Sequence, residues 1–343
     1  MGGDYQMSLL KIKNLSTEYH TLEGNVKAVD DISFSVKKGE ALGVVGESGC
    51  GKSTVMKSIL KLLPKNGKIS SGKIIYKDQD ITGYNNKQLR EIRWKEISII
   101  SQGAMNSFNP VYNIGKQLIE VMTIQGNYNE KEARKKAAEL FEIVGLDKKR
   151  LNDYPHQMSG GMRQRSMIAM SLALDPSLII ADEPTTALDV VIQDRILGKI
   201  SELQKQMNLS MLFVTHDISI IAEVCQRLMV MYSGKIAEIS TTHNIFKKPC
   251  HPYTMGLINA IPTVVKSTEH LVSIPGYPPN LINPPKGCRF APRCPFATEK
   301  CRNKAPAMRS ISENHRAACH YTNRAVEFRQ KANNRETWKG LLV

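Results

Sequence analysis

Short apolar runs alternate with longer amphipathic stretches from about residue 11 to residue 240. Four runs are compact and apolar enough to be buried strands: Ala41–Val45, Ile97–Ile100, Leu178–Ala181 and Met211–Thr215. The stretches between them carry apolar residues at helical spacing. This alternation of buried strands with helices predicts an α/β layer fold.

One helix is well marked by its ends. Asn129 followed by Glu132 resembles a capping box with Asn in place of Ser or Thr, and Gly145 is placed to end the helix. The apolar positions between them recur at helical spacing: Ala133, Ala137, Leu140, Phe141 and Val144.

The composition changes after about residue 270. Five prolines fall between Pro275 and Pro285, which predicts an extended linker and excludes a helix there. Four cysteines follow between Cys288 and Cys319, among many Arg and Lys. The last twenty or so residues are polar and basic, and we expect no packing from them.

Composition and charge narrow the class of protein. Hydrophobic residues make up 41% and charged residues 23%, as in ordinary globular proteins, and 343 residues indicate about two domains. The 47 Lys and Arg exceed the 32 Asp and Glu by 15, which favours anionic partners such as nucleotides, nucleic acid or an acidic membrane surface. No apolar run approaches the roughly 18 residues of a membrane span. The start lacks the apolar core of a signal peptide, and we expect residues 1–6 to precede a native start at Met7.

A glycine-rich segment carries the first chemistry. Residues 46–53 read Gly-Glu-Ser-Gly-Cys-Gly-Lys-Ser, the phosphate-loop pattern, directly after a predicted strand and before a helix predicted over 54–63, which Pro64 would end. Glycines let backbone N–H groups face phosphate oxygens, Lys52 can reach the β- and γ-phosphates, and Ser53 can ligate Mg²⁺. The residues expected to hold the nucleotide here are Gly46, Glu47, Ser48, Gly49, Cys50, Gly51, Lys52, Ser53 and Thr54.

Two carboxylates end the apolar run that starts at Leu178. We expect Asp182 to hold Mg²⁺, directly or through water, and Glu183 to polarise the attacking water. Acidic residues often begin loops, so the pair alone indicates little. Together with the phosphate loop it indicates a site that hydrolyses a nucleotide.

From about residue 11 to 240 the chain resembles the ATP-binding subunit of an ATP-binding cassette (ABC) transporter. Met158-Ser159-Gly160-Gly161-Met162 is similar to the family signature Leu-Ser-Gly-Gly-Gln, with Met at its first and last positions. Met162 lacks the amide of the signature, so no polar role is transferred to it. The other positions that match family motifs are Tyr19, Gln102, Ala187-Leu188-Asp189 and His216.

The resemblance implies a role for each of these residues. Tyr19 would stack on adenine, Gln102 would ligate Mg²⁺, and His216 would contact the γ-phosphate and orient water. Ser159, Gly160 and Gly161 open a helix whose free N–H groups would bind ATP held by the opposite subunit. Because the chain has one phosphate loop and one signature, it needs a second ABC ATPase subunit, identical or related, to complete two composite sites.

Further stretches resemble the peptide-importer branch of the family: residues 102–110, residues 159–165, and His251-Pro252-Tyr253-Thr254 ahead of the cysteines. They imply an ATPase that energises import of di- or oligopeptides from the cytoplasmic face of the cell membrane. The implied partners are two transmembrane permease subunits, a sister ATPase and an extracytoplasmic peptide-binding protein. A nickel importer is an alternative, because that branch shares much of the pattern.

A soluble ABC ATPase that acts on nucleic acid is a further alternative. The charge permits it, but the basic residues are spread along the chain and no coiled-coil insertion interrupts the cassette. We therefore expect no nucleic-acid partner. The expected organisation is an ABC-type cassette over 7–240, with a helical subdomain over about 103–165, and a C-terminal metal-binding extension over 241–343.

The four cysteines of the tail are spaced C-x5-C-x6-C-x17-C. Four thiolates can hold zinc or an iron–sulfur cluster, and the spacing matches neither a short zinc-ribbon pair nor a common ferredoxin run. Some peptide-importer subunits carry a [4Fe–4S] cluster here, so the resemblance implies that cluster, with zinc or unliganded cysteines as the alternatives. The basic residues around the four cysteines in sequence would favour thiolates if they lie close in space: Arg289, Arg293, Lys300, Arg302 and Arg316. His315 and His320 could replace cysteine ligands, but we expect both histidines to lie in solvent. The expected ligands are Cys288, Cys294, Cys301 and Cys319.

Overall fold

The structure is a computed structural model that describes residues 8–101, 107–185, 189–261 and 274–339. Its contacts divide the chain into two compact units. The first takes the described part of residues 1–10, 36–41 and 76–214, and the second takes residues 11–35, 42–75 and 215–343. Neither unit is continuous in sequence, because the chain passes between them several times.

A parallel sheet lies at the centre of the first unit. Its strands are β6 (Ile97–Ile100), β7 (Leu178–Asp182) and β8 (Ser210–Thr215), with Ile97 opposite Leu178 and Leu178 opposite Ser210. All three strands were predicted, and each observed end lies within one residue of its prediction. Their side chains are almost all buried, as expected of strands covered on both faces.

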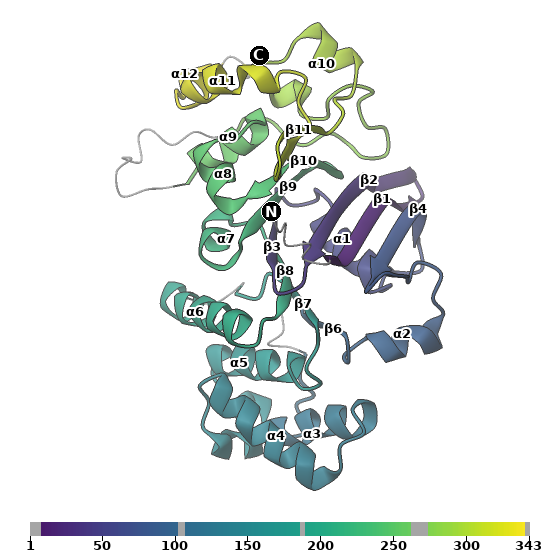
Figure 1. The fold of residues 1–343 in the computed structure, drawn as a ribbon, viewed down its shortest axis with the longest axis vertical. Coiled ribbons are helices and arrows are strands. Elements are labelled where there is room, and N and C mark those ends of the chain that lie inside the picture. Colours follow the sequence, from purple (N-terminus) through teal and green to yellow (C-terminus); the bar gives the residue numbers. More distant parts are fainter. Residues whose placement is uncertain (1–7, 102–106, 186–188, 262–273, 340–343) are drawn as a thin grey trace, which may run out of the picture. The chain divides into compact units, whose positions relative to one another are not determined.

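Helices make up most of the rest of the first unit. They are α2 (Asn86–Ile92), α3 (Ile114–Gln125), α4 (Glu130–Ile143), α5 (Gly160–Ser171) and α6 (Val190–Gln206), with a short strand β5 (Gln79–Asp80) and 3-10 turns at Lys148–Asn152 and Pro155–Gln157. Helix α4 packs on α3 and on α5 (Figure 1). The predicted capping box is confirmed, since Asn129 and Glu132 each accept a hydrogen bond from the other's backbone N–H, at 2.9 and 3.0 Å.

Two sheets form the second unit. One contains β1 (Ser8–Thr21), β2 (Gly24–Lys37) and β4 (Gly67–Tyr76), with β1 in the middle. The other runs in the order β3 (Ala41–Val45), β9 (Arg227–Tyr232), β10 (Lys235–Thr241), β12 (His315–Ala317) and β11 (Arg309–Ser312). Strands β3 and β9 are parallel, whereas the other neighbours are antiparallel. Residues of the C-terminal tail thus extend a sheet that begins at residue 41.

Helix α1 (Lys52–Ile59) is shorter than predicted. The sequence predicted a helix that continues to Leu63 and stops at Pro64. Instead the chain leaves the helix at Lys61, whose φ of 51° is left-handed, and the backbone N–H of Leu62 donates to the carbonyl of Lys57 at 2.8 Å. A local turn, not the proline, therefore ends the helix.

The remaining helices are α7 (Ile218–Val224), α8 (Thr242–Lys247), α9 (Pro252–Asn259), α10 (Glu299–Asn303), α11 (Ala325–Ala332) and α12 (Glu336–Lys339). The expectation that the polar tail would not pack is wrong. Helix α11 packs on α9 (Figure 1), Phe328 stacks on Phe296 with ring centroids 4.2 Å apart, and Trp338 is buried. Two aromatic side chains are enough to anchor an otherwise polar segment.

The proline-rich segment has neither helix nor strand over residues 274–287, as predicted. It is nevertheless held in place, because the carbonyl of Leu281 accepts from the backbone N–H of Lys27 at 3.0 Å. Within the described residues, the helices are all too short or too polar to cross a bilayer.

Candidate functional site

The phosphate loop links β3 to α1 and depends on two glycines. A Cβ at Gly46 would lie 2.2 Å from the carbonyl oxygen of Met231, and one at Gly51 would lie 2.3 Å from that of Ala28. Gly51 also has a φ of 104°, which side chains disfavour. The loop is therefore pressed against β2 and β9, and no other residue fits at these two positions.

Lys52 folds back over this loop. Its ammonium donates to the carbonyl oxygens of Gly46 at 2.6 Å and Glu47 at 3.1 Å, and its side chain is almost fully buried. Burial raises the pKa of the Cys50 thiol in the same loop, with Lys52 acting in the opposite direction. The structure thus places a cation at the centre of the loop, where a triphosphate would need one.

Tyr19 lies at the end of the phosphate loop. Its hydroxyl is 3.2 Å from the hydroxyl of Thr54, and a Cβ at Gly67 would come within 2.8 Å of its ring. The structure therefore brings Tyr19 and Thr54 together. That the ring stacks on adenine stays a prediction.

The two predicted carboxylates sit where β7 ends. Asp182 is the last residue of the strand and pairs with Val214, and the backbone N–H of Glu183 donates to the carbonyl of Val214 at 2.8 Å. Glu183 has a left-handed φ of 47°. Such backbone strain is typical of functional positions, and the carboxyl ends of parallel strands are where α/β sheets bind ligands.

His216 follows β8 directly and precedes α7. Asp217 caps that helix, since its carboxylate accepts from the backbone N–H of Ser219 at 2.8 Å. The chain is therefore fixed on both sides of His216. Its proposed contact with a γ-phosphate stays a prediction.

Ser159 caps α5, as expected, and accepts from the backbone N–H of Met162 at 3.3 Å. Met162 thus takes part in this cap through its backbone N–H. A Cβ at Gly161 would lie 2.8 Å from Ile192 of α6, so close helix packing also requires this glycine. Gln102, Ala187 and Leu188 lie outside the described residues.

The four tail cysteines line one small cavity of about 20 Å³. Phe290, Phe296 and Phe328 contribute aromatic walls. The backbone N–H of Cys288 donates to the carbonyl of Cys301 at 2.7 Å, which ties the two halves of the cavity together. Residues spread over more than thirty positions of sequence are thus assembled around one space, with sulfur as its main ligand atom: Cys288, Cys294, Cys301 and Cys319.

Burial, not nearby positive charge, dominates the chemistry of these thiols. It raises the pKa of Cys319 to about 11 and also raises the pKa values of Cys288 and Cys294. Two of the surrounding arginines are paired with carboxylates instead, because Arg289 bonds to Asp30 and Arg293 to Glu47 at 2.8 Å. A bound cation would have to displace the thiol protons, which is the usual behaviour of cysteine metal sites. The four-sulfur lining therefore fits a thiophilic metal centre.

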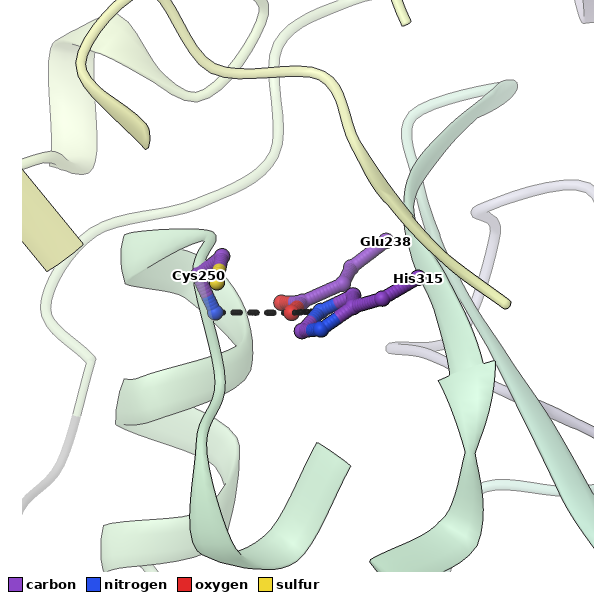
Figure 2. Close-up of side chains that lie close together, drawn as sticks. All are labelled: Glu238, Cys250 and His315. Carbon is purple, nitrogen blue, oxygen red and sulfur yellow. Dashed lines mark hydrogen bonds and ion pairs between the residues drawn. The ribbon is translucent and has the colours of Figure 1, made fainter. Parts of the chain in front are cut away.

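A second group of ligand-type side chains lies on β10, β12 and the segment before α9. Glu238, Cys250 and His315 have ligand atoms within 4.8 Å of one another, but both carboxylate oxygens are already engaged (Figure 2). One accepts from the backbone N–H of Cys250 at 2.7 Å and lies 2.6 Å from the His315 ring, and the other accepts from the backbone N–H of His251 at 2.9 Å. We call these three residues the Glu238 cluster. The cluster is buried and serves as a structural anchor, since hydrogen bonds satisfy the charge of its carboxylate.

The two histidines expected in solvent are both buried. His315 contacts Glu238, and the His320 ring nitrogen lies 2.8 Å from the carbonyl of Lys304. The partners come from segments far away in sequence, so local polarity gave no sign of them.

Each residue of the His251-Pro252-Tyr253 stretch has a structural role at the start of α9. The His251 ring accepts from the backbone N–H of Tyr253 and so caps α9, and Pro252 takes the first helical position. Burial lowers the pKa of His251 to about 4, which keeps the ring neutral and able to accept. Tyr253 is fully buried, and its hydroxyl accepts from the backbone N–H of Glu47 at 3.0 Å.

Comparisons with known proteins agree with this arrangement. Residues 29–186 match the ABC transporter family, and residues 237–301 match the C-terminal region of oligopeptide/dipeptide transporters. The chain is 45% identical to the probable peptide ABC transporter ATP-binding protein y4tR of Sinorhizobium fredii, over 93% of this chain and 97% of that one. It is 45% identical to the oligopeptide transport ATP-binding protein OppD of Haemophilus influenzae, over 86% of this chain and 91% of that one.

A third relative is the dipeptide transport ATP-binding protein DppD of Escherichia coli, which is 41% identical over 92% of this chain and 97% of that one. Among solved structures, the chain resembles the dimeric bacterial ABC transporter cassette MJ0796 with a TM-score of 0.61 and 27% identity, over 68% of this chain and 98% of that one. The same cassette is also known in a post-hydrolysis state bound to ADP and Pi, with the same TM-score and coverage. The chain belongs to the ABC transporter family, within the group of ATP-binding proteins that carry the oligopeptide/dipeptide transporter C-terminal region.

Proposed function

We propose that this chain is the ATP-hydrolysing subunit that energises import of dipeptides or oligopeptides. The observation that carries the proposal is the presence, in one chain, of a formed phosphate loop and of the C-terminal region typical of oligopeptide/dipeptide transporters. The named relatives are peptide transport proteins, and this chain matches each of them over most of its length. This favours peptides over nickel as cargo, and a transporter over an enzyme that acts on nucleic acid.

Each residue of the nucleotide site has its own role in the proposed ATP hydrolysis. Residues 46–54 with Lys52 would hold the phosphates, and Ser53, Asp182 and Gln102 would hold Mg²⁺. Glu183 would position and polarise the attacking water, His216 would contact the γ-phosphate, and Tyr19 would stack on the adenine. Mg²⁺ would neutralise charge that develops on the phosphates during transfer.

The proposed active form contains two cassettes. The chain has one signature helix, capped by Ser159, and one phosphate loop, whereas its structural relative MJ0796 is a dimer. The N-terminus of α5, at Gly160 and Gly161, would bind the γ-phosphate of the partner's ATP. Release of the phosphate would then weaken the pairing and return the transporter to its resting form.

The proposed partners follow from this role. They are a second ABC ATPase subunit, two transmembrane permease subunits and an extracytoplasmic peptide-binding protein, and they would place the chain peripherally at the cytoplasmic face of the membrane. Residues 7–240 would form the cassette, with the part that contacts the permease in the helical region over about 103–165, and residues 241–343 the extension.

Reconstitution tests this function. The chain would be assembled with its neighbouring transporter subunits in proteoliposomes, and ATP hydrolysis and uptake would be measured with labelled dipeptide, labelled pentapeptide and Ni²⁺. We expect ATP-dependent peptide uptake. Uptake of Ni²⁺ alone, or hydrolysis stimulated by nucleic acid and not by peptide, would overturn the proposal.

We also propose that the four-cysteine cavity holds a [4Fe–4S] cluster. The cavity offers four thiolate ligands around one space, from Cys288, Cys294, Cys301 and Cys319. A tetrahedral zinc site with Zn–S bonds of about 2.3 Å would hold its sulfurs about 3.8 Å apart. In a [4Fe–4S] cluster each thiolate binds a different iron, so the four sulfurs would lie farther apart than around one zinc ion.

Hydrogen bonds to the sulfurs also support a cluster. The backbone N–H of Tyr321 donates to the sulfur of Cys319 at 3.4 Å, and the hydroxyl of Thr298 donates to that of Cys301 at 3.6 Å. Such contacts tune the potentials of iron–sulfur centres. With four protein ligands the cluster would leave no open iron, which fits a structural or redox-sensing role.

Elemental analysis of anaerobically purified chain tests the cluster. We expect about four iron and four sulfide per chain, loss of both in Cys294→Ser, and retention in the control Cys225→Ser, which lies outside the cavity. One equivalent of zinc without sulfide would refute the cluster and support the alternative.

A further inference from the structure

The phosphate loop makes two contacts with the C-terminal extension, both through Glu47. The Glu47 carboxylate accepts from the Arg293 guanidinium at 2.8 Å, and its backbone N–H donates to the Tyr253 hydroxyl at 3.0 Å. The Arg293 side chain is 6% exposed and that of Glu47 is 27% exposed. Residues almost 250 positions apart in sequence thus form a partly buried ion pair at the edge of the nucleotide loop.

The guanidinium of Arg293 is fixed by several partners. It donates to the carbonyls of Pro275 at 2.8 Å and Ile274 at 3.2 Å, and to the hydroxyl of Tyr232 at 3.3 Å. The side chain therefore cannot follow Glu47 if the loop moves, and it holds the carboxylate at one position. Four directional hydrogen bonds make this a rigid contact, unlike a surface ion pair.

A carboxylate in this loop has an electrostatic cost. The loop is shaped to hold a triphosphate, whose negative charges a free Glu47 would repel, and partial burial strengthens such repulsion by lowering the local dielectric. Lys52 donates to the carbonyl oxygen of Glu47 at 3.1 Å and is the cation expected to bind the phosphates. The charge of Glu47 therefore needs its own cation, which Arg293 supplies.

We propose that Arg293 of the extension is a positioning residue for ATP binding, which neutralises Glu47 and, together with Tyr253, sets the shape of the phosphate loop. The extension then controls how tightly the cassette of the same chain binds ATP. Arg293 touches neither phosphate nor water in this role, so it affects the affinity for ATP and not the chemical step.

The test measures binding of a fluorescent ATP analogue to the full-length chain. We expect Arg293→Ala to raise Kd by roughly tenfold, the size of effect typical of one lost charge-assisted hydrogen bond. We expect Glu47→Gln to cancel most of that loss when combined with Arg293→Ala, because the unpaired carboxylate is then gone. Arg293→Lys should recover part of the affinity, since it keeps the charge but not the forked geometry.

A matched control and a kinetic readout separate positioning from folding. Arg302→Ala removes an exposed arginine of the same segment and should leave Kd unchanged. In the reconstituted transporter, Arg293→Ala should raise KM for ATP while kcat at saturating ATP stays within about twofold. If Arg293→Ala does not fold, Tyr253→Phe, which removes one buried hydroxyl, should still raise Kd by about threefold.

Two results would overturn the proposal. One is wild-type ATP affinity in both Arg293→Ala and Tyr253→Phe, or in Tyr253→Phe if the first variant does not fold. The other is a double variant, Arg293→Ala with Glu47→Gln, that binds ATP as weakly as Arg293→Ala alone, because a purely structural role for Arg293 would not depend on the charge of Glu47.

Discussion

The Glu238→Gln substitution should destabilise the extension strongly. Glu238 is fully buried, and its carboxylate accepts from the backbone N–H groups of Cys250 and His251 and contacts the ring of His315. Glutamine has nearly the same shape. It replaces one acceptor oxygen by an N–H₂ donor, which must then face a backbone N–H donor.

The size of the effect follows from these contacts. The substitution removes at least one hydrogen bond to a charged group, worth about 1.5–3 kcal/mol, and leaves a buried N–H unsatisfied at a similar cost. Together they lower the free energy of unfolding by about 3–5 kcal/mol. Because each kcal/mol lowers Tm by about 2–4 °C in domains of this size, the expected loss is roughly 6–20 °C.

Differential scanning calorimetry of the full chain measures this loss, and hydrogen exchange over residues 235–260 and 309–320 locates it. The control is Glu313→Gln, an exposed glutamate next to β12, which should change Tm by less than about 2 °C. A Glu238→Gln protein that melts within 2 °C of the wild type, with unchanged hydrogen exchange in both segments, would refute the stabilising role of the Glu238 cluster.

Three other predictions concern the nucleotide site, pH and the cavity. Glu183→Gln should slow phosphate release by roughly 10²- to 10⁴-fold while ATP still binds, and should accumulate an ATP-bound dimer; normal turnover would remove Glu183 from its role. Burial lowers the pKa of His251 to about 4 from 6.5, so between pH 4 and pH 6.5 the folded chain binds fewer protons than the unfolded chain. The free energy of unfolding should therefore be about 2 kcal/mol lower at pH 5 than at pH 7. Calorimetry at both pH values should show that His251→Gln loses this difference and that the exposed His243→Gln keeps it. Cys288→Ser should lose iron, measured by elemental analysis, while ATP binding persists; unchanged iron content would count against the cavity as the site.

Local sequence patterns predicted the elements that local forces determine. The strands β6, β7 and β8 were recognisable because burial on both faces requires unbroken apolar runs. The start of α4 was recognisable because Asn129 and Glu132 complete each other's backbone hydrogen bonds within one turn. The phosphate loop was recognisable because its residue types stand at fixed spacing between a strand and a helix, although Gly46 and Gly51 are also required by contacts with the distant Met231 and Ala28.

Contacts between distant segments could not be predicted in this way. Nothing near Glu238 in sequence indicates that it will contact His315. Nothing near Arg293 indicates that it will pair with Glu47 and not with the neighbouring thiols. The burial of Trp338 and Phe328 was missed because two aromatic residues in a polar stretch give no periodic signal. These features depend on the fold as a whole, and they became visible only with the structure.

The pairing of β12 with β10 decides where related subunits can be recombined. A chimaera joined just after Thr241 would leave Glu238 on one parental segment and His315 on the other. A junction ahead of Arg227 would carry both residues, β9 and the whole tail as one inherited block. Exchange of tails between homologous transporters should therefore succeed best where both parents already share this glutamate and histidine and also the pair of Glu47 with Arg293.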